Sequence, residues 1–180
     1  MLFMIYTLVP LGNPGNKYVS TRHNVARIVL DLISDEIKKL SSCEIFVPDT
    51  YMNESGRAVS EYLRYHEGRE LVVVYDDKDL PIGTIKISFD RGSGGHNGVK
   101  SIIDALGAKD FIRIRIGIAQ KDENGKAVMP TGIDTQDYVL GKISESEEES
   151  LRSVAPHILS AIKTITEEGY QKAMEKINGI

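Results

Sequence analysis

Residues 8–24 read Leu-Val-Pro-Leu-Gly-Asn-Pro-Gly-Asn-Lys-Tyr-Val-Ser-Thr-Arg-His-Asn, and they pass from a strand pattern to a helix pattern. The apolar run Leu2–Leu11 has the length and side-chain types of a buried strand. The turn-forming cluster at 12–15 ends it. Apolar residues then recur at three- and four-residue steps, which predicts a helix from about Asn24 to Leu40 with Thr21 or Asn24 as its N-cap. The polar residues between lie at a strand end, where open α/β sheets bind ligands.

Further strands are predicted from apolar runs and from alternation. A short one is expected at Ile45–Val47, and a central one at Glu70–Tyr75, ended by an acidic turn over residues 76–79. Thr84–Phe89 and Phe111–Ile118 alternate between apolar and polar residues, as half-buried strands do.

Helices are predicted between these strands. One begins near Asn53, and another follows the glycine-rich loop and closes on Gly107. A third covers residues 145–167, with a kink or break near Ala155 because Pro156 follows it. A short helix follows Gly169, and residues 119–137 are expected to form a long loop. We therefore expect one α/β domain over residues 1–180, with a twisted, mostly parallel mixed sheet sandwiched between helices in three layers.

The composition suits a compact domain in a reducing compartment. The chain has 180 residues, 41% of them hydrophobic, and a formal net charge of -4. Its single cysteine, Cys43, excludes an intrachain disulfide. The N-terminal apolar run is short and has no basic residue before Lys17, so we interpret it as a first strand and not as a signal peptide. A cytoplasmic, monomeric protein without a membrane partner is expected.

Two titratable residues lie at predicted strand ends and suit acid–base chemistry. His23 is a candidate general base, and Asp76, at the same edge of the sheet, is a candidate partner that fixes its tautomer. The alternative is that the two residues only cap a helix and a turn.

Three asparagines also follow or flank strand ends, namely Asn13, Asn53 and Asn97. A side-chain amide has two donors and one acceptor, which suit a peptide backbone or a developing oxyanion. Ordinary turn chemistry is the alternative for each of them.

The glycine-rich stretch 92–101 does not fit a nucleotide-binding loop. Val99 separates Gly98 from Lys100, and Asn97 stands where a dinucleotide fingerprint needs glycine. No residues have zinc-ligand spacing, and Lys78 within the acidic cluster argues against magnesium. We expect no metal and no cofactor.

Several motifs together resemble the bacterial peptidyl-tRNA hydrolase family, in the right order and over nearly the whole chain. They are Gly12-Asn13-Pro14-Gly15 with Tyr18, Thr21-Arg22-His23-Asn24, Thr50-Tyr51-Met52-Asn53 with Ser55-Gly56, Asp76-Asp77-Lys78-Asp79-Leu80-Pro81-Ile82-Gly83, Gly94-Gly95-His96-Asn97-Gly98 with Lys100, Arg113-Ile114-Arg115-Ile116-Gly117-Ile118, and Gly169-Tyr170-Gln171-Lys172-Ala173-Met174.

The resemblance implies hydrolysis of the ester between a peptide and the 3′-terminal ribose of tRNA. It implies that His23 activates water, that Asp76 holds His23, and that Asn97 orients the water or stabilises the tetrahedral intermediate. Substrate-binding roles for Asn13 and Asn53 at the peptide end, and for Tyr18 and Met52 as apolar walls, are implied as well. A non-catalytic RNA-binding relative and a small-molecule esterase are the alternatives.

Contacts to tRNA phosphates are expected from Lys86, Lys100, Arg113 and Arg115. The two arginines project from one face of a strand, since side chains two apart point the same way. Alternatively, they neutralise acidic residues nearby. The chain departs from the family in Pro10, in Ser88 where many members carry lysine, and in a shortened segment over residues 41–52.

Overall fold

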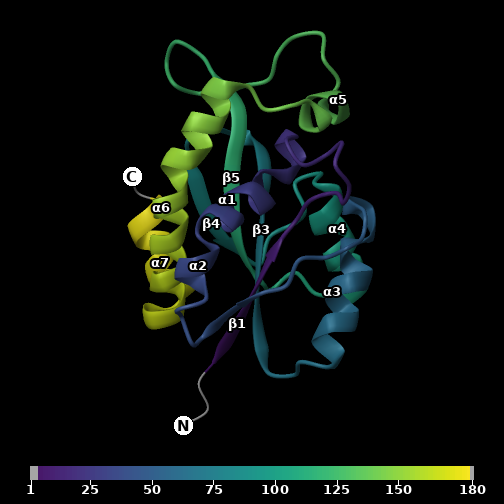
Figure 1. Cartoon of the computed structure of the whole chain (residues 1–180), viewed down its shortest axis with the longest axis vertical. Helices are drawn as coiled ribbons and strands as arrows, with labels where there is room; N and C mark the ends of the chain where they lie inside the picture. The colour runs from purple at the N-terminus through teal and green to yellow at the C-terminus, as the bar shows by residue number, and fades with distance from the viewer. Residues whose placement is uncertain (1–3, 179–180) are drawn as a thin grey trace.

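The computed structural model describes residues 4–178, in which helices alternate with the strands of one sheet (Figure 1). The strands are β1 (Ile5–Pro10), β2 (Cys43–Ile45), β3 (Arg69–Pro81), β4 (Ile85–Phe89), β5 (Ile112–Lys121) and β6 (Ala127–Val128). The helices are η1 (Arg22–Asn24), α1 (Val25–Leu32), α2 (Ser34–Ile37), η2 (Met52–Glu54), α3 (Ser55–Arg64), α4 (Asn97–Leu106), α5 (Thr135–Leu140), α6 (Glu145–Glu168) and α7 (Tyr170–Asn178). The predicted first strand is confirmed as β1, although its residues 2 and 3 lie outside the described part.

The sheet has the order β2-β1-β3-β5-β4, and β6 pairs with β5. Strands β2, β1, β3 and β5 run parallel, whereas β4 and β6 are antiparallel to β5. Because parallel strands end at the same edge, the segments that follow β1 and the polar end of β3 meet there. The predicted mixed, mostly parallel sheet is confirmed.

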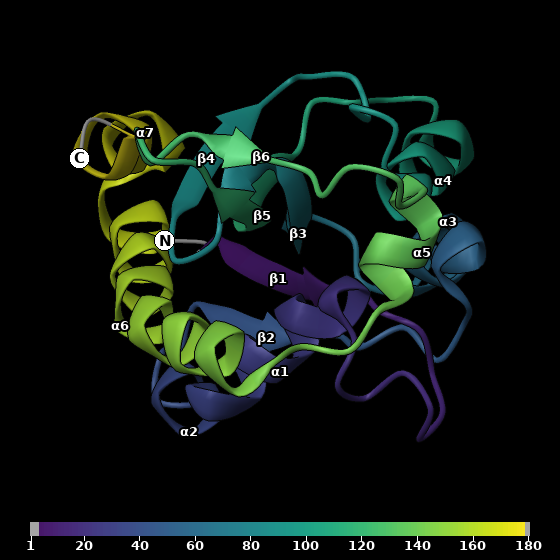
Figure 2. The same cartoon turned by 90° about the horizontal axis from the view of Figure 1, so that it is seen from above.

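Alternation along β3 divides the core into two halves. Val72 and Val74 pack on one face of the sheet with apolar residues of α1, α6 and α7. Leu71, Val73 and Tyr75 pack on the other face with residues of η2, α3 and α4. Helices thus cover both faces in three layers (Figure 2), as predicted.

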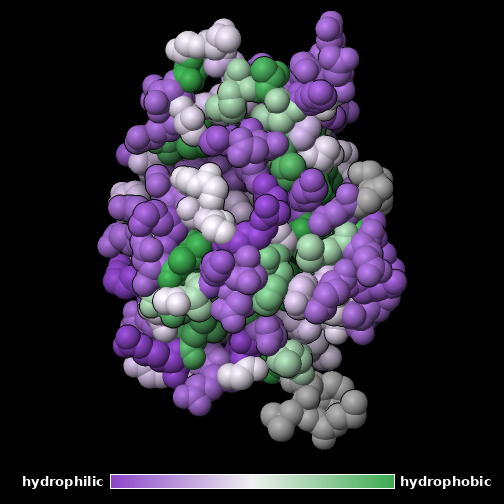
Figure 3. Space-filling model, turned by 180° about the vertical axis from the view of Figure 1, so that it is seen from behind, coloured by the Kyte–Doolittle hydropathy of each residue, from purple (hydrophilic) through white to green (hydrophobic). Residues whose placement is uncertain are grey.

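Hydrophilic residues cover most of the face seen from behind, where hydrophobic residues appear in small separate groups (Figure 3). No helix within residues 4–178 has both the length and the apolar composition that crossing a membrane requires.

Three helical predictions are corrected. The helix predicted at 24–40 is divided into α1 and α2, because Ile33 leaves helical geometry at φ -117° and ψ 12°. Neither predicted N-cap bonds a helix amide through its side chain. The predicted break near Ala155 is wrong, since α6 is continuous. Pro156 lies on the exposed side of α6, where water can bond the carbonyl that proline leaves without its helical partner.

The strand predictions need three corrections. The acidic turn at 76–79 is wrong, because β3 continues to Pro81 by pairing Asp76 and Asp77 with β5. The long loop at 119–137 contains the end of β5, strand β6 and the start of α5. Finally, β2 begins two residues earlier than the strand predicted at Ile45–Val47.

Gly56 permits the close crossing of α3 and α4. A Cβ atom there would overlap the backbone carbonyl of Ser101, and the Gly56 amide donates to Ser101 Oγ at 2.9 Å. The replacement Gly56→Ala should therefore lower the free energy of unfolding by about 1–3 kcal/mol, measured by urea denaturation. Gly92→Ala is the matched control, because a Cβ atom at Gly92 meets no atom within 4 Å. Equal stability of the two variants would contradict this account of the crossing.

Candidate active site

A cavity of about 830 Å³ opens where β1 and β3 end. Its wall includes residues from the loop after β1, from η2, from the end of β3, from the glycine-rich loop and from α5. Most residues of this wall are polar, and most of the residues predicted to be functional line it: Asn13, Tyr18, His23, Met52, Asn53, Asp76, Asn97, Arg113 and Arg115.

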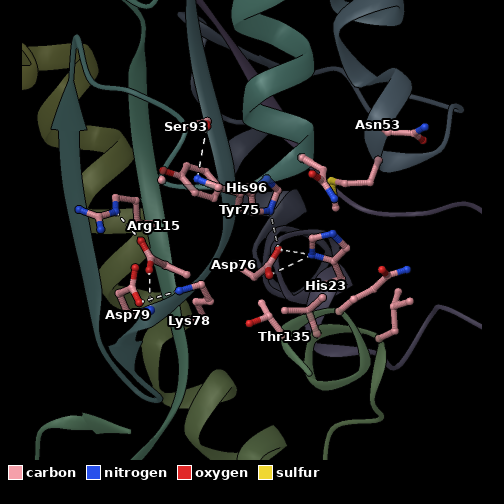
Figure 4. Close-up of a pocket in the computed structure, with 18 of the residues that line it drawn as sticks. His23, Asn53, Tyr75, Asp76, Lys78, Asp79, Ser93, His96, Arg115 and Thr135 are labelled. Carbon is pink, nitrogen blue, oxygen red and sulfur yellow. Dashed lines mark hydrogen bonds and ion pairs between the residues drawn. The ribbon is translucent and has the colours of Figure 1, made fainter. Parts of the chain in front are cut away.

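Two imidazoles share the buried carboxylate of Asp76 (Figure 4). His23 Nδ1 lies 2.8 Å from Asp76 Oδ1 and 3.0 Å from Oδ2. His96 Nε2 lies 2.9 Å from the same Oδ1. The pairing of His23 with Asp76 was predicted from sequence, whereas the contribution of His96 was missed.

The hydrogen bonds assign the protons on both rings. The backbone amide of Val99 donates to His96 Nδ1 at 3.3 Å, so the proton of neutral His96 is on Nε2, which donates to Asp76. His23 Nδ1 likewise donates to the carboxylate, which leaves the lone pair on His23 Nε2. Nε2 of His23 is therefore the basic atom of the site.

Asp76 remains ionised in this environment. Burial alone would raise the pKa of its carboxyl group, but the hydrogen bonds from His96 and His23, together with the positive charge of each ring when it is protonated, outweigh burial and lower that pKa. His23, Asp76 and His96 are also the described residues whose nitrogen and oxygen atoms gather closely enough to suggest a metal site. Within the protein these atoms hydrogen-bond to one another, because His23 Nδ1 and His96 Nε2 both contact the Asp76 carboxylate.

Asn13 is held rigidly at the end of β1. Its Oδ1 accepts a hydrogen bond from the Met52 amide at 2.8 Å. The side chain of Asn24 bonds both the amide and the carbonyl of Asn13, each at 2.9 Å. Since Oδ1 is occupied, the Nδ2 donors of Asn13 remain for a ligand. The fixing role of Asn24 was not predicted.

The other predicted site residues differ in burial and position. Asn97 is exposed and begins α4, directly after His96. Asn53 is exposed on η2 and lies apart from Asp76 (Figure 4). Met52 is buried, and its Sδ atom approaches Gly98 so closely that a Cβ atom there would lie 2.5 Å away. The ring of Tyr18 meets Tyr51 edge-on, with centroids 6.3 Å apart.

The four predicted phosphate contacts have unequal access. Arg113 is 1% exposed and donates to the carbonyls of Arg91 and Gly92, so its guanidinium holds the glycine-rich loop. Arg115 Nε lies 2.6 Å from Asp77 Oδ2, as in the alternative interpretation that the arginine neutralises an acidic neighbour. Lys86 and Lys100 are exposed, and Lys100 Nζ lies 2.5 Å from Asp104. The burial of Arg113 removes it from the proposed contacts.

Comparison with known proteins identifies the family of this chain. Residues 7–180 match the family model described as peptidyl-tRNA hydrolase. The chain belongs to the peptidyl-tRNA hydrolase family. It is 42% identical to the peptidyl-tRNA hydrolase of Fervidobacterium nodosum, with 96% of each chain covered. It is 40% identical to that of Pseudothermotoga lettingae, with 95% of each chain covered.

A solved structure shares the fold over the same length. The crystal structure of peptidyl-tRNA hydrolase from Acinetobacter baumannii matches with a TM-score of 0.83 and 26% sequence identity. The match covers 99% of this chain and 96% of that one. The family's fold therefore extends over essentially the whole chain.

The lowered pKa of Asp76 predicts a specific acid sensitivity. A carboxyl whose pKa is lower in the folded state stabilises the fold above its unfolded pKa, and this stabilisation is lost as pH falls through the folded pKa. Wild-type protein should therefore lose more stability between pH 5 and pH 2.5 than Asp76→Asn does, measured by urea denaturation. Asp35→Asn, at an exposed carboxylate 3.1 Å from Lys38, should follow the wild type. Equal losses in wild type and Asp76→Asn would contradict the assignment.

Proposed function

We propose that this protein hydrolyses the ester bond between a peptide, or an N-blocked amino acid, and the 3′-terminal ribose of tRNA. The observation that carries the proposal is the buried His23–Asp76 pair, whose basic Nε2 atom lies in a large cavity at the strand ends. Membership of the peptidyl-tRNA hydrolase family over the whole chain supports it. A protein that only bound RNA would not require an imidazole held in one tautomer.

The reaction follows from the proton arrangement. A water molecule attacks the ester carbonyl while His23 Nε2 takes one of its protons, and the Asp76 carboxylate stabilises the imidazolium. The side-chain amide of Asn97 orients the water or donates to the oxyanion of the tetrahedral intermediate. When the intermediate collapses, the carbon–oxygen bond to ribose breaks and the proton on His23 passes to the ribose oxygen. The products are a peptide with a free carboxyl group and tRNA.

The peptide end would lie along the η2 side of the cavity. Asn13 offers its Nδ2 donors close to the site, since Met52 and Asn24 fix its orientation. Asn53 lies farther from His23 and would contact the peptide beyond the ester. Tyr18 and Met52 supply apolar surface to the same wall.

The tRNA would lie on the β4–β5 side of the cavity. Arg115 lines the cavity, and Lys86 pairs with it across β4 and β5, so both side chains project from the same face of the sheet. Lys100 extends this basic surface from α4. Ser88 pairs across the strands with buried Arg113 and brings no charge, which leaves Arg115 and the two lysines as the proposed phosphate contacts.

We further propose that the enzyme acts as a monomer in the cytoplasm. Burial raises the pKa of the Cys43 thiol to about 11. This thiol therefore stays protonated and unreactive at neutral pH, which suits a protein that makes no intermolecular disulfide.

Release of free tRNA from N-acetyl-aminoacyl-tRNA tests the function and its base together. The wild-type protein should release tRNA, and His23→Ala should lower turnover by about 10²–10⁴, the usual effect of losing a general base. Binding of the substrate should be largely kept. His157→Ala, at an exposed histidine of α6, is the matched control and should retain full turnover. Unimpaired turnover in folded His23→Ala would refute the assignment of the base.

If Arg115 binds a tRNA phosphate, removing its charge should weaken the binding of tRNA substrates. Arg115→Ala should raise KM for full-length tRNA substrates and reduce the salt dependence of KM by about one charge. A minimal substrate without acceptor-stem phosphates should be almost unaffected. Because the change also leaves Asp77 without its ion pair, Arg115→Ala with Asp77→Asn separates the two effects, and Lys163→Ala on α6 is the distant control. If KM rises equally for both substrates, Arg115 has a structural role and does not bind phosphate.

A further inference from the structure

Arg22, the residue before His23, ties the loop of the general base to the segment that contains α5. Its Nε and Nη2 atoms lie 2.8 and 3.0 Å from the two carboxylate oxygens of Glu147. Its Nη1 donates to the Tyr138 carbonyl at 3.2 Å, and the guanidinium lies 4.4 Å from the centre of the Tyr138 ring. We call the contacts among Arg22, Tyr138 and Glu147 the Arg22 clasp.

Several contacts fix the orientation of Glu147 and Arg22 in the clasp. Glu147 also accepts a hydrogen bond from the Ser144 amide at 2.7 Å, as part of the capping box that begins α6. Burial alone would raise the pKa of Glu147, but hydrogen bonds from Arg22 and Ser144 outweigh it and lower that pKa. The side chains of Arg22 and Glu147 are only 15% and 13% exposed, so solvent weakens this bidentate pair less than a surface pair.

Backbone contacts run beside the clasp. The Arg22 amide donates to the Gly141 carbonyl at 3.0 Å, and the Ile143 amide donates to the Ser20 carbonyl at 2.9 Å. Gly141 leaves room for the guanidinium, because a Cβ atom there would lie 2.7 Å from Arg22 Nη1. The segment between α5 and α6 therefore pairs directly with the chain that leads into His23.

The clasp joins the His23 loop to α5, and these two segments differ in what else holds them in place. His23 is buried and held independently by Asp76. In contrast, α5 is a six-residue helix, exposed over much of its length, that packs mainly against η1. Its Tyr138 hydroxyl also donates to the Ile118 carbonyl at 2.7 Å. So short a helix is not stable by itself, and α5 is the element that the clasp holds in place.

The α5 segment forms one wall of the reaction cavity. Thr135, Gln136, Val139 and Leu140 line the cavity together with His23 and Asp76, and Figure 4 labels Thr135 among the residues around it. We propose that Arg22 is a positioning residue, which holds α5 against the His23 loop so that this wall is already in place when substrate binds. The proposal rests on the proposed hydrolysis of peptidyl-tRNA. A preformed wall spares the substrate the entropy cost of ordering it.

Two variants weaken the clasp in different ways. Glu147→Gln keeps an acceptor for the Ser144 amide, and hence the capping box, but loses the charge that binds Arg22. Arg22→Lys keeps the charge but cannot make the bidentate pair or stack its plane on Tyr138. Glu148→Gln is the matched control, since it removes only the exposed pair of Glu148 with Arg152, 2.7 Å apart on the same helix.

The kinetic test separates substrate binding from chemistry. Both clasp variants should raise KM for N-acetyl-aminoacyl-tRNA on the order of tenfold, the size expected for one charge-assisted hydrogen bond. Their kcat, and the pH profile of kcat, should match the wild type, because His23 and Asp76 are untouched. The double variant should be no worse than either single one, since all of them break the same pair. An unchanged KM, or a fall in kcat alone, would overturn the proposal.

Hydrogen exchange tests the clasp without relying on activity. The amides of residues 138–141 should exchange faster in both clasp variants, whereas those of β3 should keep their wild-type protection. Glu148→Gln should leave both sets unchanged. If α5 keeps its protection in the clasp variants, the proposal fails even when the enzyme is active. If wild-type protein releases no tRNA but α5 loosens as expected, the proposed function fails and the holding of α5 by Arg22 stands.

Discussion

A carboxylate that is 2% exposed must be compensated, and Asp76 meets this requirement with two imidazoles from different parts of the chain. An isolated charge in that position would cost several kcal/mol of desolvation. The carboxylate therefore accepts from both rings, and each ring is left with one defined tautomer. The same requirement brings η1, β3 and the start of α4 together at one point. The proposed base, His23 Nε2, keeps its lone pair because the other nitrogen of the ring donates to this buried charge.

The parallel strands supply the framework for that point. In the sheet, β1 lies beside β3, so the loop after β1 reaches the polar end of β3. Pro10 is the last residue of β1. The Leu11 amide donates to Val74 on the β3 side, so position 10 faces β2, beyond the last pair of Leu8 with Ile45. A proline is tolerated where no partner strand needs its amide.

Two arginines on one strand face have different roles because their neighbours differ. Arg113 lies under the glycine-rich loop and bonds its carbonyls, so it shapes the backbone that presents His96 and Asn97. Arg115, two residues on, pairs with Asp77 at the cavity. Asp77 follows Asp76 directly in the chain. Asp77 pairs with Arg115, whereas the two imidazoles contact Asp76. The alternation of side chains along β5 puts both arginines on one face of the sheet. Their exposure differs because the glycine-rich loop covers Arg113, whereas Arg115 lies at the cavity.

The sequence by itself determined most of the local elements and identified the candidate reactive residues. Apolar periodicity specified most of the strands and helices, although it missed β6 and α5, and Gly107 closes α4 at φ 65° as expected, because such signals depend on near neighbours. His23, Asp76 and Asn13 were recognisable from their motifs and strand ends. Only the tertiary structure decided the continuation of β3 through its acidic residues, since Asp76 and Asp77 gain their pairing from β5. It also decided the contact of His96 with Asp76 and that of Arg22 with Glu147. These depend on segments far apart in the chain, which no local pattern relates.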